Sequence, residues 1–143
     1  MTPELHDLDR FVTAQAPHHD RVLAELRGGR KRSHWMWFVF PQIAGLGHSA
    51  MSIHYAIRSL DEARAYLAHP VLGPRLIECC EAVLSVPDRS AHDIFGSPDD
   101  MKLQSCATLF AHVTPRGSVF DQVLDRYFEG RRDQRTLSLV TPT

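Results

Sequence analysis

Short helices with strong start and stop signals dominate this sequence, and they restrict the fold that the chain can adopt. Apolar residues recur three and four positions apart along most of the chain, which is the spacing of one helix face. The breaks Ala16-Pro17 and Gly28-Gly29 and the capping box Ser59-Leu-Asp-Glu62 interrupt this pattern. No segment alternates cleanly between apolar and polar residues. We therefore predict an all-α fold, a compact multihelical bundle of about seven or eight short helices.

Serines mark the start of several of these helices. Ser90 is expected to cap a single turn that Gly96 closes. Ser97 is expected to cap the next helix, with Pro98 at its first position, and Ser118 the helix after that. The second half of the chain is therefore predicted to fold as a series of separate helices.

One segment, Trp35–Phe40, is apolar at every position, so periodicity does not distinguish a buried strand from a buried helix. Ser33 is a suitable helix cap before it, and Pro41 is a clean stop after it. A lone strand would leave its backbone amides unpaired. We predict a buried helix.

Length, charge and composition exclude several classes of protein. The chain has 143 residues, which is one ordinary domain, and we predict a single domain over residues 1–143 without a separate linker or tail. Its 16 basic and 17 acidic residues give a net charge of -1, which argues against a nucleic-acid-binding protein. The longest apolar run is too short to span a membrane, and the first residues do not resemble a secretory signal. We expect a cytoplasmic protein.

Cysteines and histidines give no sign of a disulfide framework or a metal site. Cys79, Cys80 and Cys106 are odd in number and poorly spaced for disulfides or zinc, so we interpret them as small apolar helix residues. The nine histidines include no pair three or four positions apart, as two ligands on one helix face would be. Glycine-rich phosphate loops, dinucleotide fingerprints and nucleophile elbows are absent from the sequence. We predict neither a metal nor a cofactor.

The segment from residue 27 to residue 42 is the strongest candidate for a binding site, because a basic loop leads into the tryptophan-rich block. Arginine and lysine side chains beside a helix N-terminus are suited to phosphate, and a tryptophan ring can stack on a base. A histidine in this position can bind a ligand or transfer a proton near neutral pH. The alternative is a solvated loop, buried tryptophans and a serine and histidine that only cap a helix. The candidates are Arg30, Lys31, Arg32, Ser33, Trp35, Trp37 and Gln42 for binding, and His34 for catalysis.

A second candidate lies at Asp99-Asp100-Met-Lys102. Carboxylates at the start of a helix are explained by the helix dipole alone. The functional alternative places Asp100 as a catalytic group and Lys102 as a ligand-binding group at the mouth of a pocket. The sequence by itself leaves both interpretations open.

The chain resembles the bacterial family known as domain of unknown function 1810. The resemblance rests first on Ser33-His-Trp-Met-Trp-Phe-Val-Phe-Pro-Gln42, followed by Gly45-Leu-Gly47. It extends over nearly the whole chain, to Tyr127-Phe-Glu-Gly130. The resemblance implies a compact, multihelical single domain and implies no activity.

Two functions from different classes are consistent with these patterns. The first is binding, with or without processing, of a small anionic nucleotide-like ligand at the basic loop and tryptophan block; the sequence does not decide whether the protein is an enzyme. The second is an interaction module without chemistry, in which an aromatic patch around Trp35 or Phe128 forms a homodimer or partner interface. Nucleic-acid binding through the basic clusters is a weaker third hypothesis.

Overall fold

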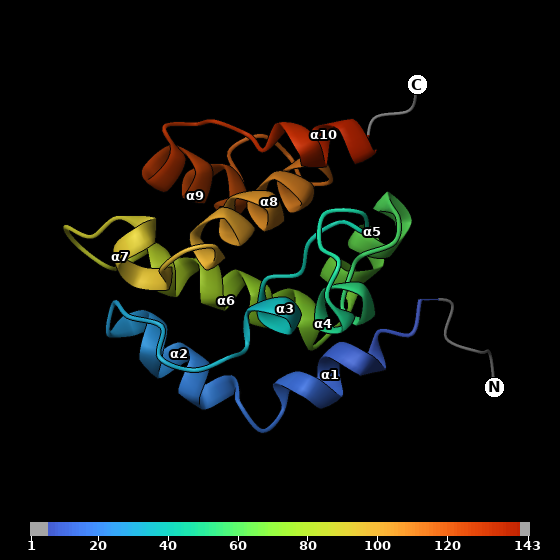
Figure 1. Ribbon diagram of the computed structural model, residues 1–143, viewed down its shortest axis with the longest axis horizontal. Coiled ribbons are helices and arrows are strands. Elements are labelled where there is room, and N and C mark those ends of the chain that lie inside the picture. Colours follow the sequence, from blue (N-terminus) through green and yellow to red (C-terminus); the bar gives the residue numbers. More distant parts are fainter. Residues whose placement is uncertain (1–5, 141–143) are drawn as a thin grey trace.

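Helices α6 (Leu72–Leu84) and α8 (Asp99–His112) form the centre of the molecule (Figure 1). The computed structural model describes residues 6–140. Each central helix packs against several neighbours. For α6 these are α2 (His19–Arg27), α5 (Leu60–Ala68) and α9 (Val119–Phe128), and for α8 they are α7 (Ala91–Phe95), α9 and α10 (Gln134–Val140).

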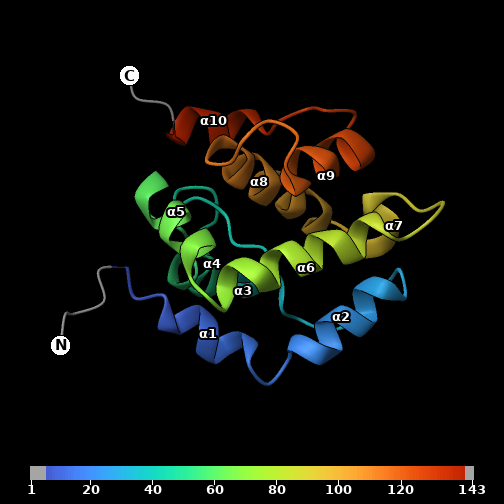
Figure 2. The same ribbon diagram turned by 180° about the vertical axis from the view of Figure 1, so that it is seen from behind.

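The remaining helices are short and lie around this centre. Helix α1 (Asp9–Gln15) packs against α3 (Met36–Val39), and α4 (Ala50–His54) lies close to α3. In both views α1 and α2 run along one side of the molecule, and α9 and α10 run along the opposite side (Figures 1 and 2). The loop between α3 and α4 therefore comes near α8, although the two are far apart in the sequence.

The prediction of an all-α fold is confirmed, with a different number of helices. Residues 6–140 contain ten helices and no strand, more than the seven or eight predicted. Three of the ten, α3, α4 (Ala50–His54) and α7, have only 4 or 5 residues. The predicted buried helix at Trp35–Phe40 is confirmed as α3, which is shorter than the apolar run that contains it. Ser33 does not cap it, because Trp35 holds the N-cap position and the Ser33 hydroxyl donates to Glu25.

The predicted caps are confirmed in part. Ser59 and Ser90 accept hydrogen bonds from first-turn amides, and Ser90 forms a reciprocal capping box with Asp93. Ser97 does not cap α8: Pro98 takes the N-cap position, and this helix has no side-chain cap hydrogen bond. Ser118 holds the N-cap position of α9, but its hydroxyl accepts from Thr114 instead of an amide.

The buried apolar side chains form one contiguous core that includes all three cysteines. Burial raises the pKa of the Cys79 thiol to about 12 and those of Cys80 and Cys106 well above their ordinary value. These thiols therefore behave as apolar packing groups, as the sequence suggested. Among the described helices, none has the length and apolar character needed to cross a bilayer.

Candidate functional site

The basic loop predicted to bind an external anion binds the carboxylate of Glu25 instead. Oε1 of Glu25 accepts hydrogen bonds from the backbone amides of Arg32, at 2.7 Å, and Ser33, at 3.1 Å. The indole N–H of Trp35 donates to the same oxygen at 2.9 Å, and the Ser33 hydroxyl donates to Oε2 at 2.6 Å. The amides of Arg32 and Ser33, the Ser33 hydroxyl and the Trp35 indole therefore already have an acceptor within the chain.

This arrangement has a clear electrostatic signature. Partial burial on its own would raise the pKa of Glu25, but the hydrogen bonds from Ser33, Arg32 and Trp35 outweigh it and lower the pKa to about 2. The carboxylate is thus ionised at all physiological pH values. It ties α2 to the loop that precedes α3.

The other predicted residues of this loop do not line the two cavities nearest Trp37. Trp35 is only 1% exposed, so it has no free ring face on which a base could stack. The side chains of Arg30, Arg32 and His34 are exposed and have no ion-pair partner within residues 6–140. Lys31 is mostly buried and forms an ion pair with Asp99, at 3.0 Å. Within this loop Lys31 contacts another part of the chain, while Arg30, Arg32 and His34 remain exposed.

Trp37, two residues further along, is placed very differently. Its side chain is partly exposed and lines a cavity, and no described residue accepts a hydrogen bond from its indole N–H. The ammonium of Lys102, on α8, lies 5.3 Å from the centre of the Trp37 ring. That distance is within the range of a cation–π interaction. The structure thus brings together two of the predicted residues that are 65 positions apart.

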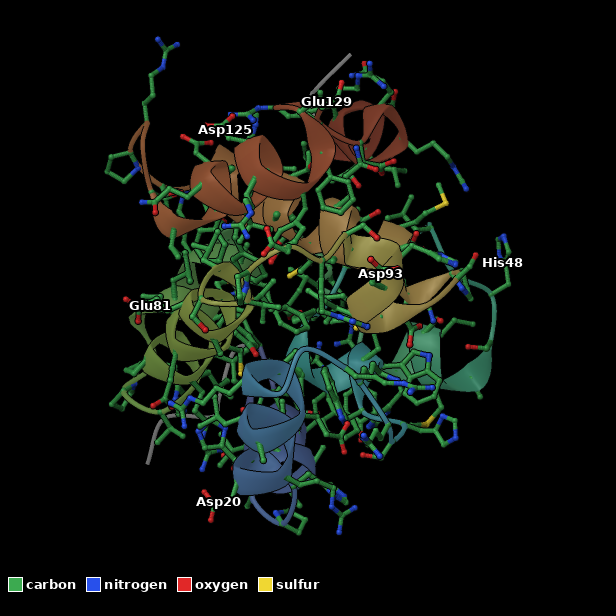
Figure 3. The ribbon with its side chains drawn as sticks, turned by 90° about the vertical axis from the view of Figure 1, so that its left-hand side faces the viewer. Asp20, His48, Glu81, Asp93, Asp125 and Glu129 are labelled. Carbon is green, nitrogen blue, oxygen red and sulfur yellow. The ribbon has the colours of Figure 1, made fainter. Side chains whose placement is uncertain are left out.

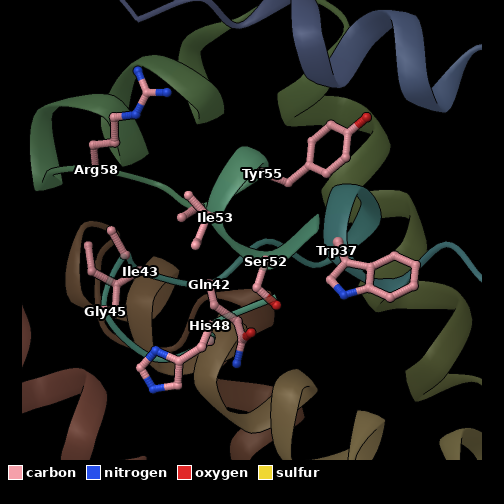
Figure 4. Close-up of a pocket in the computed structure, with 12 residues that line it drawn as sticks. Trp37, Gln42, Ile43, Gly45, His48, Ser52, Ile53, Tyr55 and Arg58 are labelled. Atoms are coloured by element: carbon pink, nitrogen blue, oxygen red, sulfur yellow. The ribbon is translucent and has the colours of Figure 1, made fainter. Parts of the chain in front are cut away.

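The cavity beside Trp37 has a volume of about 350 Å³. Figure 4 shows Gln42, Ser52 and His48 close to one another, with Trp37 beside them and Arg58 at the far end. His48 projects from the edge of the molecule, as Figure 3 also shows. The remaining lining is apolar or backbone, from Ile43, Ala44, Gly45, Gly47, Ile53, Tyr55 and Ala56.

A second cavity of about 220 Å³ adjoins the first, and the two share Gln42, Gly47 and Ser52 as lining residues. Lys102 and Arg135 supply positive charge to the second cavity. Its one acidic lining residue, Asp133, caps α10 by accepting hydrogen bonds from the amide and hydroxyl of Thr136. We call the two cavities together the groove. Its size falls within the roughly 300–1,000 Å³ of small-molecule sites.

Backbone hydrogen bonds shape one wall of the groove. Ile43 and Ile57 form an isolated parallel bridge, in which the amide of Ile57 donates to Gln42 and the amide of Ala44 donates to Ile57, each at 2.8 Å. Gly47 has a steric requirement, since a Cβ atom at this position would lie 2.5 Å from the Cβ of Ser52. The glycine therefore allows the loop to approach α4 closely.

A buried ion pair supports the same wall from behind. Arg10 Nη2 lies 2.9 Å from Oε1 of Glu62, and both side chains are almost fully buried. Arg10 also donates to the carbonyl oxygens of His54, at 2.9 Å, and Ala56, at 2.8 Å. The sequence analysis missed this pair, because Glu62 was assigned only to a capping box.

The second predicted catalytic residue, Asp100, does not line the groove. Its carboxylate accepts from the amide of Met101 and lies 3.6 Å from a ring nitrogen of His92. His34 and Asp100 are therefore not brought together at the groove. Within the part of the chain that the structure describes, no three His, Cys, Asp or Glu side chains are grouped as a metal site would need.

The molecule is thus a small all-α protein with a surface groove, in which the aromatic ring of Trp37 lies beside the positive charge of Lys102. The chain belongs to the family described as "Protein of unknown function (DUF1810)", which it matches over residues 5–140. This confirms the resemblance seen in the sequence. No curated protein matches the chain.

A solved structure extends the comparison to three dimensions. The chain is 53% identical to the conserved hypothetical protein Rv1873 from Mycobacterium tuberculosis, whose crystal structure it matches with a TM-score of 0.95. The match covers 98% of this chain and 100% of that one. The family and this relative carry no stated activity, so function is argued from the groove.

Proposed function

We propose that the groove binds a small anionic ligand with a planar group, of the nucleotide type. The observation that carries this proposal is the Lys102 ammonium 5.3 Å from the centre of the Trp37 ring at the groove. A planar group stacked on Trp37 would place an attached anion near Lys102. The proposal keeps Trp37, Gln42 and Lys102 from the sequence-based site.

Further support comes from polar groups without partners. Arg58 and Arg135 line the groove and have no ion-pair partner among residues 6–140. Arginine binds phosphate and carboxylate through paired N–H groups, so both are suited to an anion. The side-chain amide of Gln42 can donate to or accept from the edge of a base.

The proposal is for binding and does not include a reaction. The predicted catalytic groups, His34 and Asp100, lie outside the groove lining. His48 is the one titratable imidazole in that lining, and no carboxylate of the described residues is within hydrogen-bonding distance of it. A general acid–base mechanism would need such a partner or a substrate-bound geometry.

Isothermal titration with adenosine 5′-monophosphate and with ADP-ribose tests the proposal. We expect binding of at least one at millimolar or lower concentration, with loss of affinity in Trp37→Ala and Lys102→Met. Arg30→Ala removes an exposed basic-loop cation and should leave the affinity unchanged. Arg116→Ala is a matched control, because Arg116 is exposed and lines a separate cavity. No binding of either compound, or equal loss in all four variants, would refute the proposal.

A second candidate function is an interaction surface, as the sequence analysis also predicted. The observation that favours it is a set of exposed apolar side chains at the groove. Ile53 is 61% exposed and Met101 60%, and each lines one of the two cavities. The interface would be aliphatic, since Trp35 is buried and Phe128 packs against the core. Sedimentation equilibrium distinguishes the candidates, because a dimer that Ile53→Ser dissociates would favour the interaction surface.

A further inference from the structure

The charge of Lys102 is shared with a carboxylate just outside the groove. Oδ1 of Asp99 lies 3.3 Å from the Lys102 ammonium, and Oδ2 lies 3.0 Å from the ammonium of Lys31. The three side chains are between 8% and 22% exposed, so solvent screens them only in part. Asp99 itself does not line either cavity.

We propose that Asp99 determines the ligand charge that the groove accepts, by acting as an internal counterion to Lys102. This inference rests on the proposed function of the groove. Two ammonium groups and one carboxylate leave a net charge of +1, and only Lys102 of the two lysines faces the groove. A ligand anion beside Lys102 therefore competes with Asp99 for the same ammonium.

The helix dipole does not account for this arrangement by itself. Asp99 and Asp100 both lie in the first turn of α8, where a carboxylate is stabilised wherever it points. Asp100 turns toward His92, whereas Asp99 bridges two lysines from different parts of the chain. The bridge holds the Lys102 side chain at the Trp37 ring and neutralises part of its charge.

The charge of the cluster changes in opposite directions in two variants. Asp99→Asn raises the net charge of the cluster to +2, while Lys31→Met lowers it to zero and leaves Asp99 to Lys102 alone. We expect Asp99→Asn to tighten binding of a dianion and Lys31→Met to weaken it. A partly exposed ion pair contributes up to about 1 kcal/mol, which corresponds to about a fivefold change in affinity.

Isothermal titration with three probes of one base separates charge from shape. Adenosine is neutral, adenosine 3′,5′-cyclic monophosphate is a monoanion, and adenosine 5′-monophosphate is close to a dianion above pH ~7. For Asp99→Asn we expect roughly two- to fivefold tighter binding of the monophosphate, a smaller gain for the cyclic compound and no change for adenosine. For Lys31→Met we expect weaker binding, with the largest loss for the monophosphate, a smaller loss for the cyclic compound and no change for adenosine.

Asp121→Asn is the matched control. Asp121 is 13% exposed, forms an ion pair with Arg132 at 2.8 Å and lines a different cavity, so its removal changes the total charge equally. It should leave all three affinities unchanged. Melting temperatures give a second measure, because a bound anion replaces the missing carboxylate and should stabilise Asp99→Asn more than the wild type.

The outcomes separate the two proposals. If the wild type binds none of the probes, the proposed function fails and the role of Asp99 fails with it. Suppose instead that the wild type binds the monophosphate. If Asp99→Asn then does not increase the affinity for the monophosphate, or changes the affinity for adenosine by the same factor, only the role of Asp99 is refuted. Should Asp99→Asn not fold, unchanged monophosphate affinity in Lys31→Met refutes it equally.

Discussion

Replacing Glu25 with Gln should destabilise the protein at neutral pH and remove part of its sensitivity to acid. The folded protein lowers the Glu25 pKa from 4.5 to about 2, and each unit of difference from the unfolded chain corresponds to ~1.4 kcal/mol. Because the carboxylate is partly exposed, solvent screening reduces this value, and we expect a loss of about 1–3 kcal/mol. Glutamine keeps one oxygen acceptor but loses the negative charge that strengthens all four hydrogen bonds.

The sign of the pH dependence follows from the lowered pKa. A carboxyl group with a depressed pKa stabilises the folded state fully above its unfolded pKa, and this stabilisation is lost as the pH falls from about 5 to about 2. Urea unfolding of the wild type and Glu25→Gln between about pH 7 and about pH 3 measures the effect. The difference between the two proteins should shrink toward low pH, where Glu25 becomes protonated in the unfolded wild type.

Glu81→Gln is the control for this experiment, since Glu81 is exposed on α6 and has no ion-pair partner among the described residues. It should leave stability nearly unchanged at every pH. Equal stability of Glu25→Gln and the wild type at neutral pH would refute the role of Glu25 as the internal anion of the basic loop. A difference that stays constant down to about pH 3 would refute the electrostatic explanation.

Three further predictions concern the groove wall and the core. Arg10→Met should lower the free energy of unfolding by about 3–5 kcal/mol, and the melting temperature by roughly 10 °C, because it leaves Glu62 buried without its arginine partner. Adding Glu62→Leu should recover part of this loss of stability. If the effects of the two substitutions simply add, the ion pair is contradicted. Gly47→Ala should lower both stability and ligand affinity, since its Cβ would overlap Ser52; calorimetry and titration that match the wild type would argue against this close approach. Thiol labelling of the native protein should be slow for all three cysteines and fast after unfolding, and rapid native labelling would contradict the raised thiol pKa of Cys79.

Only some of the residues that line the groove could be identified from the sequence. Trp37 and Gln42 belong to the most distinctive motif, and Lys102 belongs to the second candidate segment, Asp99-Asp100-Met-Lys102, so these were named in advance. Arg58 and Arg135 were missed because each is one arginine among fourteen, with no local pattern to separate it from a solvated residue. Their relevance comes from cavities whose walls belong to α4, α8 and α10.

The assignment of the basic loop illustrates a different limit. The sequence correctly placed a cationic loop beside a serine and a tryptophan, and it required an acceptor for each buried indole N–H. It did not specify which anion would serve. Glu25 lies seven to ten residues before its donors, and the turn at Gly28 reverses the chain so that the carboxylate meets them.

Helix positions, some of the caps and the apolar faces follow from the sequence alone, because each depends on residues within one or two turns of one another. The partners of the charged side chains were decided by tertiary structure. Lys102 meets Trp37 across 65 residues and Arg10 meets Glu62 across 52, and neither pair leaves a periodic signal. Tertiary packing also determined that Trp35 is buried beside Glu25 while Trp37 lines the groove. The side of a short helix that remains exposed depends on the segments packed around it.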